Sequence, residues 1–212
     1  MRKITSQFST YLILLIAAVI PFLTSACNEQ TIDSSKFTTV DSIEMPLPDV
    51  VEIFALSCGH CRNIEKMLRE LEQKAGISIH KMHAVFNERT ANEAYLYYSA
   101  DIQLPPVQKQ RAEFTEHLFD LIQSPASAQF SNGRELYLKE LFQLYDITNP
   151  EQLTQEQHEK IISLSRQSQD LVNAVRLSAV PTLIIKGKYI INLGAHRSLD
   201  DLQKTISYLL NS

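Results

Sequence analysis

The sequence predicts an α/β fold in which an all-helical insertion interrupts a β-sheet between the second and third core strands. Three observations support this prediction. An apolar run, Val50 to Phe54, is followed almost at once by a helical repeat of apolar residues. Residues 89–178 then show only helical patterning. Strand patterning resumes at Thr182 and is followed by a last helix, so the same sheet is expected to continue after the insertion.

The N-terminal segment, residues 1–26, has the pattern of an export signal. It begins with two positive charges and continues with an apolar run of 13 residues, 11–23, which is too short for a comfortable membrane span. The sequence at 23–27 also resembles a bacterial lipobox, which predicts a lipoprotein-type signal and lipidation of Cys27. Ordinary cleavage after Ala26 is the alternative.

Length, charge and cysteine content narrow the function classes. The 212 residues are enough for one domain with a sizeable core. Loss of residues 1–26 removes two positive and no negative charges, so the formal charge changes from −4 to −6, and nucleic acid is not an expected partner. If Cys27 is acylated, only Cys58 and Cys61 remain for a disulfide. A single pair in an exported chain favours a catalyst over a disulfide-stapled scaffold.

Residues 27–44 are polar and predict a tether between the membrane and the folded domain. The tether is too short to hold a separate dimerisation domain, so we expect a monomer. The domain itself is expected in two parts, 45–88 and 179–212, on either side of the helical insertion.

The expected elements follow from periodicity and from breaking residues. The first helix runs from about Cys58 to Ala75 and stops at Gly76, and the next strand covers Ile77 to Phe86. Three tyrosines, Tyr95, Tyr97 and Tyr98, are assigned to helix packing. Further helices are expected at 90–100, after Pro105-Pro106, at 134–145, at 150, from 154 and at 167–177. A hairpin of 183–185 with 189–192 and a last helix at 200–210 follow them.

The pair Cys58-x-x-Cys61 stands where the first strand passes into the first helix. The first turn of a helix carries unpaired backbone N–H groups and the positive end of the helix dipole. A thiolate is favoured over a thiol there, so Cys58 is expected to be acidic and reactive. Cys61 lies one turn further along the helix, close enough to form a disulfide with Cys58.

Cys-x-x-Cys pairs also occur in zinc sites and at covalently attached haem. Zinc needs about four ligands, and without a second cysteine pair His80 and His83 would have to supply the rest. Covalent haem attachment needs a histidine after the second cysteine, where this chain has Arg62. A redox disulfide is therefore the favoured interpretation.

Four features occur together in the chain: Cys58-Gly59-His60-Cys61 after an apolar strand, Glu52 six residues before it, Lys81 in the next strand, and Val180-Pro181-Thr182 before a hairpin. In these features the chain, from about Asp49 to the C-terminus, resembles the DsbA-like thiol:disulfide oxidoreductases of the thioredoxin superfamily. The resemblance implies a thioredoxin-like fold with a helical insertion in the same place. Gly59 departs from the family, because DsbA itself has proline there.

The resemblance assigns roles to the residues of the motif. Cys58 is the expected nucleophile, and Cys61 is the buried resolving thiol that frees the product. His60 is expected to stabilise the Cys58 thiolate as a nearby cation. The alternative for His60 is a solvated histidine in the first turn of a helix.

Four further residues are expected around the cysteines. Glu52, with apolar neighbours, is expected to be buried with a raised pKa and to accept the Cys61 proton; an exposed edge strand is the alternative. Lys81 is its candidate partner, or else an exposed strand lysine. Val180 and Pro181 are expected to form a cis-proline loop that binds substrate, and the alternative is an ordinary trans turn.

The predicted function is an exported thiol:disulfide oxidoreductase that introduces disulfides into secreted proteins in the bacterial periplasm, with no cofactor and no metal. The expected partners are reduced, unfolded exported proteins, and the resemblance implies a DsbB-like membrane quinone reductase as reoxidant. Two alternatives stay open: a periplasmic disulfide reductase for specific clients, and a metal-binding carrier that uses both cysteines and a histidine. The other histidines show no partner pattern and are expected at the surface or in the core: His80, His83, His117, His158 and His196.

Overall fold

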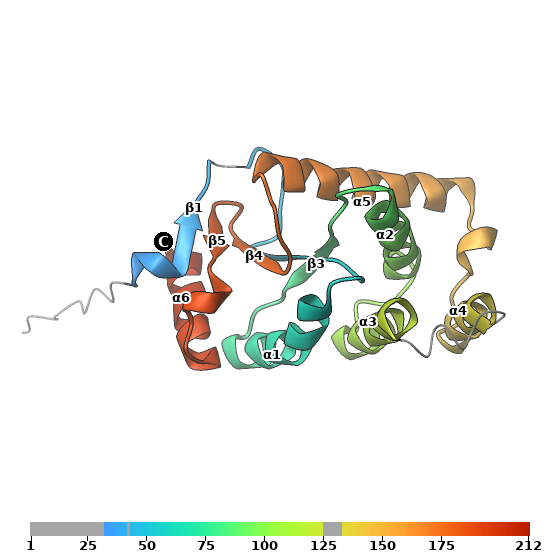
Figure 1. Ribbon diagram of the computed structural model, residues 1–212, viewed down its shortest axis with the longest axis horizontal. Helices are drawn as coiled ribbons and strands as arrows, with labels where there is room; N and C mark the ends of the chain where they lie inside the picture. Colours follow the sequence, from blue (N-terminus) through green and yellow to red (C-terminus); the bar gives the residue numbers. More distant parts are fainter. Residues whose placement is uncertain (1–31, 42, 125–132) are drawn as a thin grey trace, which may run out of the picture. The chain divides into compact units, whose positions relative to one another are not determined.

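The computed structural model describes residues 32–41, 43–124 and 133–212 of the chain. Within these residues a five-stranded sheet has the order β1-β5-β4-β2-β3, and β2 runs parallel to β3 and antiparallel to β4 (Figure 1). The strands are β1 (Phe37–Thr39), β2 (Val50–Phe54), β3 (His80–His83), β4 (Thr182–Ile185) and β5 (Tyr189–Ile191).

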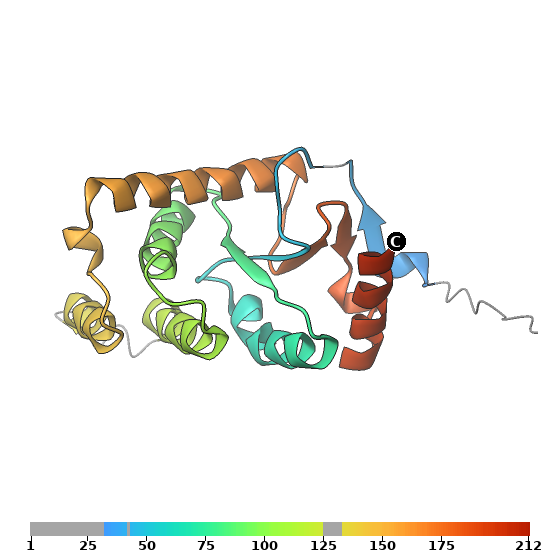
Figure 2. The same ribbon diagram turned by 180° about the vertical axis from the view of Figure 1, so that it is seen from behind.

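Strand β2 lies in the interior of the sheet, and all five of its residues are buried. Its alternating side chains point to opposite faces of the sheet. Val50 packs with α1 (Gly59–Ala75) and α6 (Leu199–Asn211) on one face, whereas Val51 and Ile53 pack with α5 (Gln155–Ala174) on the other. Because helices lie on both sides of the sheet (Figure 2), the strand is apolar on both faces, and Glu52 is its one polar residue.

Helix α1 follows β2 after a short loop and presents one buried face to the core. Its buried residues are Cys61, Glu65, Leu68 and Leu71, which recur every three or four positions. The helix ends at Gly76, whose φ of 64° is in the left-handed region that glycine adopts without strain. The sequence prediction for this helix, including its stop, is confirmed.

The helical insertion lies between β3 and β4, and the predicted fold class is confirmed. It contains α2 (Glu88–Asp101), α3 (Gln108–Gln123), α4 (Gly133–Leu144), the short 3-10 helix η3 (Pro150–Gln152) and α5. Tyr97 and Tyr98 are buried in its core and Tyr95 packs against that core, in line with the helix-packing prediction. The same cluster includes Phe54 and Cys61, so the insertion packs directly against the end of β2 and the start of α1.

Two boundaries differ from the sequence prediction. The strand expected at 77–86 is limited to β3, 80–83, because only these residues pair with β2. The two helices expected from 154 and at 167–177 are one helix, α5. No proline or glycine occurs within α5, and its buried residues Ile161, Ser168 and Leu171 continue one face along its length.

Residues 37–39 stand within the segment expected as a polar tether, yet they form β1. The strand pairs antiparallel with β5, so that Phe37 lies opposite Ile191. Next to it, the Lys36 ammonium lies 2.5 Å from the Asp201 carboxylate in α6. The sheet therefore includes a strand that lies earlier in the chain than the hydrophobic pattern indicates.

The expected export signal, 1–26, and the expected lipidation site, Cys27, lie outside the described residues. Among the residues that the structure does describe, no helix combines the length and apolar character needed to cross a bilayer.

Candidate active site

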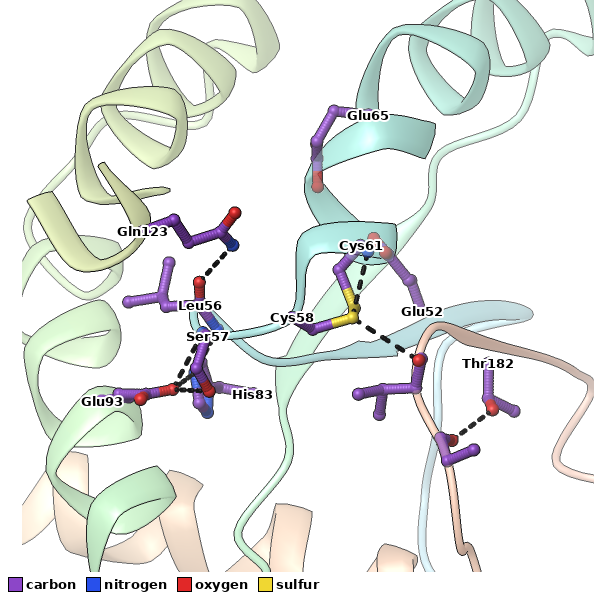
Figure 3. Close-up of a disulfide and its surroundings, with 12 residues drawn as sticks. Glu52, Leu56, Ser57, Cys58, Cys61, Glu65, His83, Glu93, Gln123 and Thr182 are labelled. Atoms are coloured by element: carbon purple, nitrogen blue, oxygen red, sulfur yellow. Dashed lines mark hydrogen bonds and ion pairs between the residues drawn. A yellow bond between two sulfur atoms is a disulfide. The ribbon is translucent and has the colours of Figure 1, made fainter. Parts of the chain in front are cut away.

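Cys58 and Cys61 form a disulfide at the N-terminus of α1, with Cα atoms 5.2 Å apart (Figure 3). Cys58 is the N-cap residue, and its Sγ accepts a hydrogen bond from the Cys61 backbone N–H at 3.0 Å. Cys58 is half-buried, whereas Cys61 is fully buried. A reacting sulfur from outside can therefore reach the first cysteine and not the second.

The Val180–Pro181 loop lies against the disulfide, and the peptide bond between these residues is cis. The Val180 carbonyl oxygen is 3.5 Å from Sγ of Cys58. Thr182, which begins β4, donates its hydroxyl to the Ala179 carbonyl at 2.9 Å and closes the turn. The structure thus brings together Cys58 and Val180, which are 122 positions apart in the chain.

Behind the disulfide, Glu52 and Lys81 form an ion pair in which Glu52 is fully buried and Lys81 is partly buried. The two residues lie opposite each other on the parallel strands β2 and β3, and the Lys81 ammonium contacts the Glu52 carboxylate directly. The same ammonium lies 2.5 Å from Glu65 in α1 and 4.4 Å from the centre of the Phe54 ring. Glu65 is one helical turn after Cys61 on the same buried face, so the cluster lies one turn from the second cysteine.

The charges of this cluster are set mainly by burial. Glu52 is fully buried, and burial raises its pKa to about 7 even though Lys81 counteracts the shift. For Lys81, burial lowers the pKa, but the two carboxylates outweigh it and raise the pKa above its usual value. Within the described residues, Oε1 of Glu52 has no hydrogen-bond donor. Glu52 can therefore hold or release a proton near neutral pH while Lys81 stays charged.

A cavity of about 570 Å³, partly open to solvent, reaches this cluster. Its walls come from α1, β3, α2 and α3, and they combine the charged residues of the cluster with apolar side chains. Its lining includes Glu52, Glu65, Lys81, Tyr97, Leu104 and Phe114. The cavity connects the buried carboxylates to the outside without passing the disulfide.

The two residues before Cys58 are held by side chains of three other elements, which the sequence analysis did not identify. The Leu56 N–H donates to His83 Nε2 of β3 at 2.9 Å, and the Leu56 carbonyl accepts from Gln123 of α3 at 2.6 Å. Ser57 donates its N–H and its hydroxyl to Glu93 of α2, at 3.0 and 2.7 Å. We call His83, Glu93 and Gln123 the loop clamp.

The chemistry of His83 fits its place in the loop clamp. Burial lowers its pKa to about 4, so it is neutral near pH 7. Its Nδ1 lies 3.0 Å from the Ala84 carbonyl, which places the ring proton on Nδ1 and leaves Nε2 as the acceptor. The sequence gives little indication of this role, because β3 contains polar residues at both exposed and buried positions and His83 is at a buried one.

Other polar residues surround the start of α1. His60 is exposed in the first turn, next to the disulfide. Arg62 reaches across to α3 and lies 2.7 Å from Glu116 and 2.5 Å from Asp120. In the part of the chain that the structure describes, no three histidine, cysteine or acidic side chains are arranged to hold a metal ion.

Comparison with known proteins agrees with this architecture. A family model described as Thioredoxin matches residues 47–207. No curated protein matches the chain. The structure is similar to that of DsbA from Klebsiella pneumoniae, with 17% identity and a TM-score of 0.64 over 86% of this chain and 98% of that one.

Two structures of Proteus mirabilis DsbA are also similar. One has 18% identity and a TM-score of 0.61, and covers 86% of this chain and 98% of that chain. The other is a Cys-to-Ser variant with a non-covalently bound peptide, with 18% identity and a TM-score of 0.57 over 85% of this chain and 97% of that chain. At these identities the likeness establishes the fold.

Proposed function

The chain belongs to the thioredoxin family, and on that premise we propose that it is an exported thiol:disulfide oxidoreductase that introduces disulfides into secreted proteins. One observation carries the proposal: a disulfide whose half-buried member, Cys58, caps a helix while its partner Cys61 is fully buried. Such a pair exposes one sulfur to attack and retains the other for the return step.

In the forward direction, a substrate thiolate attacks Sγ of Cys58 and breaks its bond to Cys61. The Cys61 sulfur leaves with the electron pair and takes up a proton. A second substrate thiolate then attacks the substrate sulfur of the mixed disulfide and releases Cys58 as a thiolate. Two electrons pass from the substrate dithiol to the cysteine pair, and the substrate gains one disulfide.

The surroundings of each sulfur support these steps. The N–H groups at the start of α1, including that of Cys61, favour the leaving Cys58 thiolate, and a protonated His60 adds to this effect. Glu52, with a pKa of about 7, shares Lys81 with Glu65, which lies one helical turn after Cys61, and it is suited to exchange a proton with the Cys61 sulfur. Lys81 keeps Glu52 in place and limits the rise of its pKa.

We infer that substrates are reduced, unfolded exported proteins that bind beside Val180 and Pro181. The proximity of the Val180 carbonyl to Cys58 supports this, as does the peptide bound to the Proteus mirabilis DsbA variant. The leader pattern at 1–26 supports periplasmic location, and Cys27 is the proposed lipid anchor. A DsbB-like membrane quinone reductase is the proposed reoxidant of a monomeric protein.

A disulfide reductase is the second candidate, since the same residues run the reaction in reverse. One observation favours it: the buried carboxylate of Glu93 lies against Ser57, next to Cys58. A negative charge there opposes the Cys58 thiolate and weakens the pair as an oxidant.

The test measures both activity and direction. The exported chain is oxidised and mixed with a reduced, unfolded ribonuclease, and regained nuclease activity is followed with and without the chain. We expect faster recovery, and loss of that acceleration in Cys58→Ser. An equally fast recovery with Cys58→Ser would refute the proposal, and an equilibrium with glutathione that strongly favours the protein disulfide would favour the reductase.

A further inference from the structure

Glu93 is a buried carboxylate that the exchange reaction itself does not use. It lies in α2 with only 5% of its surface exposed, against the residue that precedes Cys58 (Figure 3). Oε2 accepts the N–H and the hydroxyl of Ser57, and Oε1 accepts Nε–H of Arg89 at 3.0 Å. Three donors, one of which belongs to the Arg89 cation, suit an ionised carboxylate, which can only accept hydrogen bonds.

This charge acts differently on the two redox forms. In the disulfide form neither sulfur is charged. In the reduced form Cys58 is favoured as a thiolate by the start of α1, and a second negative charge nearby disfavours it. Because Glu93 is buried, solvent and salt screen it less than a surface carboxylate. The repulsion therefore falls on the reduced form alone.

Nearby charges reduce this repulsion without cancelling it. The Arg89 guanidinium pairs with Glu93, but its side chain is 72% exposed and is well screened by water. Glu93 and Arg89 line a surface hollow of about 530 Å³, and its other charged lining residues are Arg134 and Glu88, which have opposite charges. His83 Nε2 lies 3.8 Å from Glu93 but accepts the Leu56 N–H, so the ring adds no positive charge.

We propose that Glu93 is a positioning residue that acts through Ser57 and sets the redox equilibrium of the Cys58–Cys61 pair, with Arg89 as its counter-charge. The carboxylate fixes the loop before the nucleophile and at the same time disfavours the Cys58 thiolate. This inference rests on the proposed exchange function. The couple exchanges two electrons with glutathione: the protein disulfide and two glutathione thiols become the protein dithiol and glutathione disulfide.

Two substitutions separate the charge from the shape. Glu93→Gln keeps an oxygen that can accept the Ser57 hydrogen bonds but removes the negative charge. Arg89→Gln removes the counter-charge and leaves the carboxylate. A purely structural role predicts that both substitutions leave the redox equilibrium unchanged, whereas a role for charge predicts shifts of opposite sign.

In the experiment, the wild-type chain, both variants and the control Glu88→Gln are equilibrated with glutathione buffers at pH 7, quenched with acid and quantified by thiol labelling. The pH dependence of Cys58 alkylation is measured on the reduced forms. Because Ser57 separates the Glu93 carboxylate from Cys58 and the site lies near the protein surface, we expect Glu93→Gln to shift the equilibrium constant about two- to ten-fold toward the reduced protein. Arg89→Gln should shift it the other way, and Glu88→Gln should match wild type.

The outcomes separate this inference from the proposed function. If wild type does not equilibrate with glutathione at all, the exchange function fails and the inference fails with it. If wild type equilibrates but Glu93→Gln and Arg89→Gln both match it, only the inference is overturned. If Glu93→Gln does not fold, the exposed Arg89 variant decides the question, because its shift in equilibrium is expected without a loss of structure.

Discussion

Replacement of Glu52 by glutamine should stabilise the protein at alkaline pH and slow its chemistry. Burial raises the pKa of Glu52 from its usual 4.5 to about 7. Between these two values the folded protein holds a proton that the unfolded chain has lost. The stability contributed by this group is therefore present below pH 4.5 and falls as the pH rises to 7.

The magnitude follows from the two pKa values. Each pKa unit corresponds to about 1.4 kcal/mol, so a change from 4.5 to about 7 costs roughly 3 kcal/mol once the pH exceeds both values. Glutamine has the shape of the protonated acid and cannot ionise. Lys81 keeps Glu65 as a partner at 2.5 Å, so the substitution leaves no isolated cation. We expect Glu52→Gln to be about 2–3 kcal/mol more stable than wild type at pH 8 and nearly equal at pH 4.

The assay combines stability with kinetics. Denaturant unfolding of the oxidised wild type, Glu52→Gln and the control Glu70→Gln is measured at pH 4, 6 and 8. Glu70 lies on the exposed side of α1, so its variant should follow wild type at every pH. Single-turnover exchange with a dithiol substrate is then followed from pH 5 to 8. We expect slower exchange in Glu52→Gln because the amide cannot take part in the proton transfer of Cys61.

Three results would contradict this reasoning. A stability difference that is the same at pH 4 and pH 8 would mean that ionisation of Glu52 does not limit stability. A less stable Glu52→Gln protein at pH 8 would mean that attraction to Lys81 exceeds the cost of burial. Exchange rates equal to wild type at all pH values would leave Glu52 with a structural role only.

Three further predictions concern the cysteines and the loop clamp. Alkylation of the reduced protein at pH 7, followed by peptide mapping, should label Cys58 well before Cys61, because Cys61 is fully buried; preferential labelling of Cys61 would reverse the assigned roles. Cys61→Ala should accumulate mixed disulfides with client proteins, visible on a non-reducing gel, and an absence of such species would argue against exchange at Cys58. His83, with a pKa lowered by burial from 6.5 to about 4, should cost stability as the pH falls from 6.5 to 4, since the unfolded chain takes up a proton first. His83→Gln keeps an acceptor for the Leu56 N–H and should remove up to about 3 kcal/mol of this loss of stability. The measurement is the difference in unfolding free energy between the variant and wild type at pH 4.5 and at pH 7. If this difference is the same at both pH values, His83 is charged in the folded protein.

Much of the framework could be predicted from sequence because its signals are local. The apolar strand, the Cys58-x-x-Cys61 pair and the helix that ends at Gly76 lie within about 30 consecutive residues, and each depends on neighbours a few positions away. The left-handed conformation at Gly76 and the apolar repeat along α1 need no knowledge of the rest of the chain. The same reasoning predicts the helical insertion, because residues 89–178 show helical rather than strand patterning.

The elements that the prediction missed depend on partners far along the chain. Phe37–Thr39 has little apolar pattern and becomes a strand only because β5, some 150 residues later, offers a free edge. The prediction of two helices between 154 and 177 was wrong for a different reason. The polar residues within α5 suggest a break, but packing against α2 and β3 keeps one continuous helix.

At the site, the sequence by itself determined the candidate residues: a cysteine pair at a helix start, a glutamate in an apolar strand and a proline before a hairpin. Only the tertiary structure decided what surrounds them. Glu65 joins the Lys81 cluster because strand β3 lies beside β2 and brings the lysine under α1.

The loop clamp is the clearest case of an arrangement that only the tertiary structure determines. Its hydrogen bonds to Leu56 and Ser57 span 27, 36 and 67 residues along the chain. No periodicity or spacing encodes such contacts, because hydrogen bonds between distant residues depend on how whole elements pack. Burial then determines the proton state of His83 and the effective strength of the Glu93 charge, and burial exists only once the chain has folded.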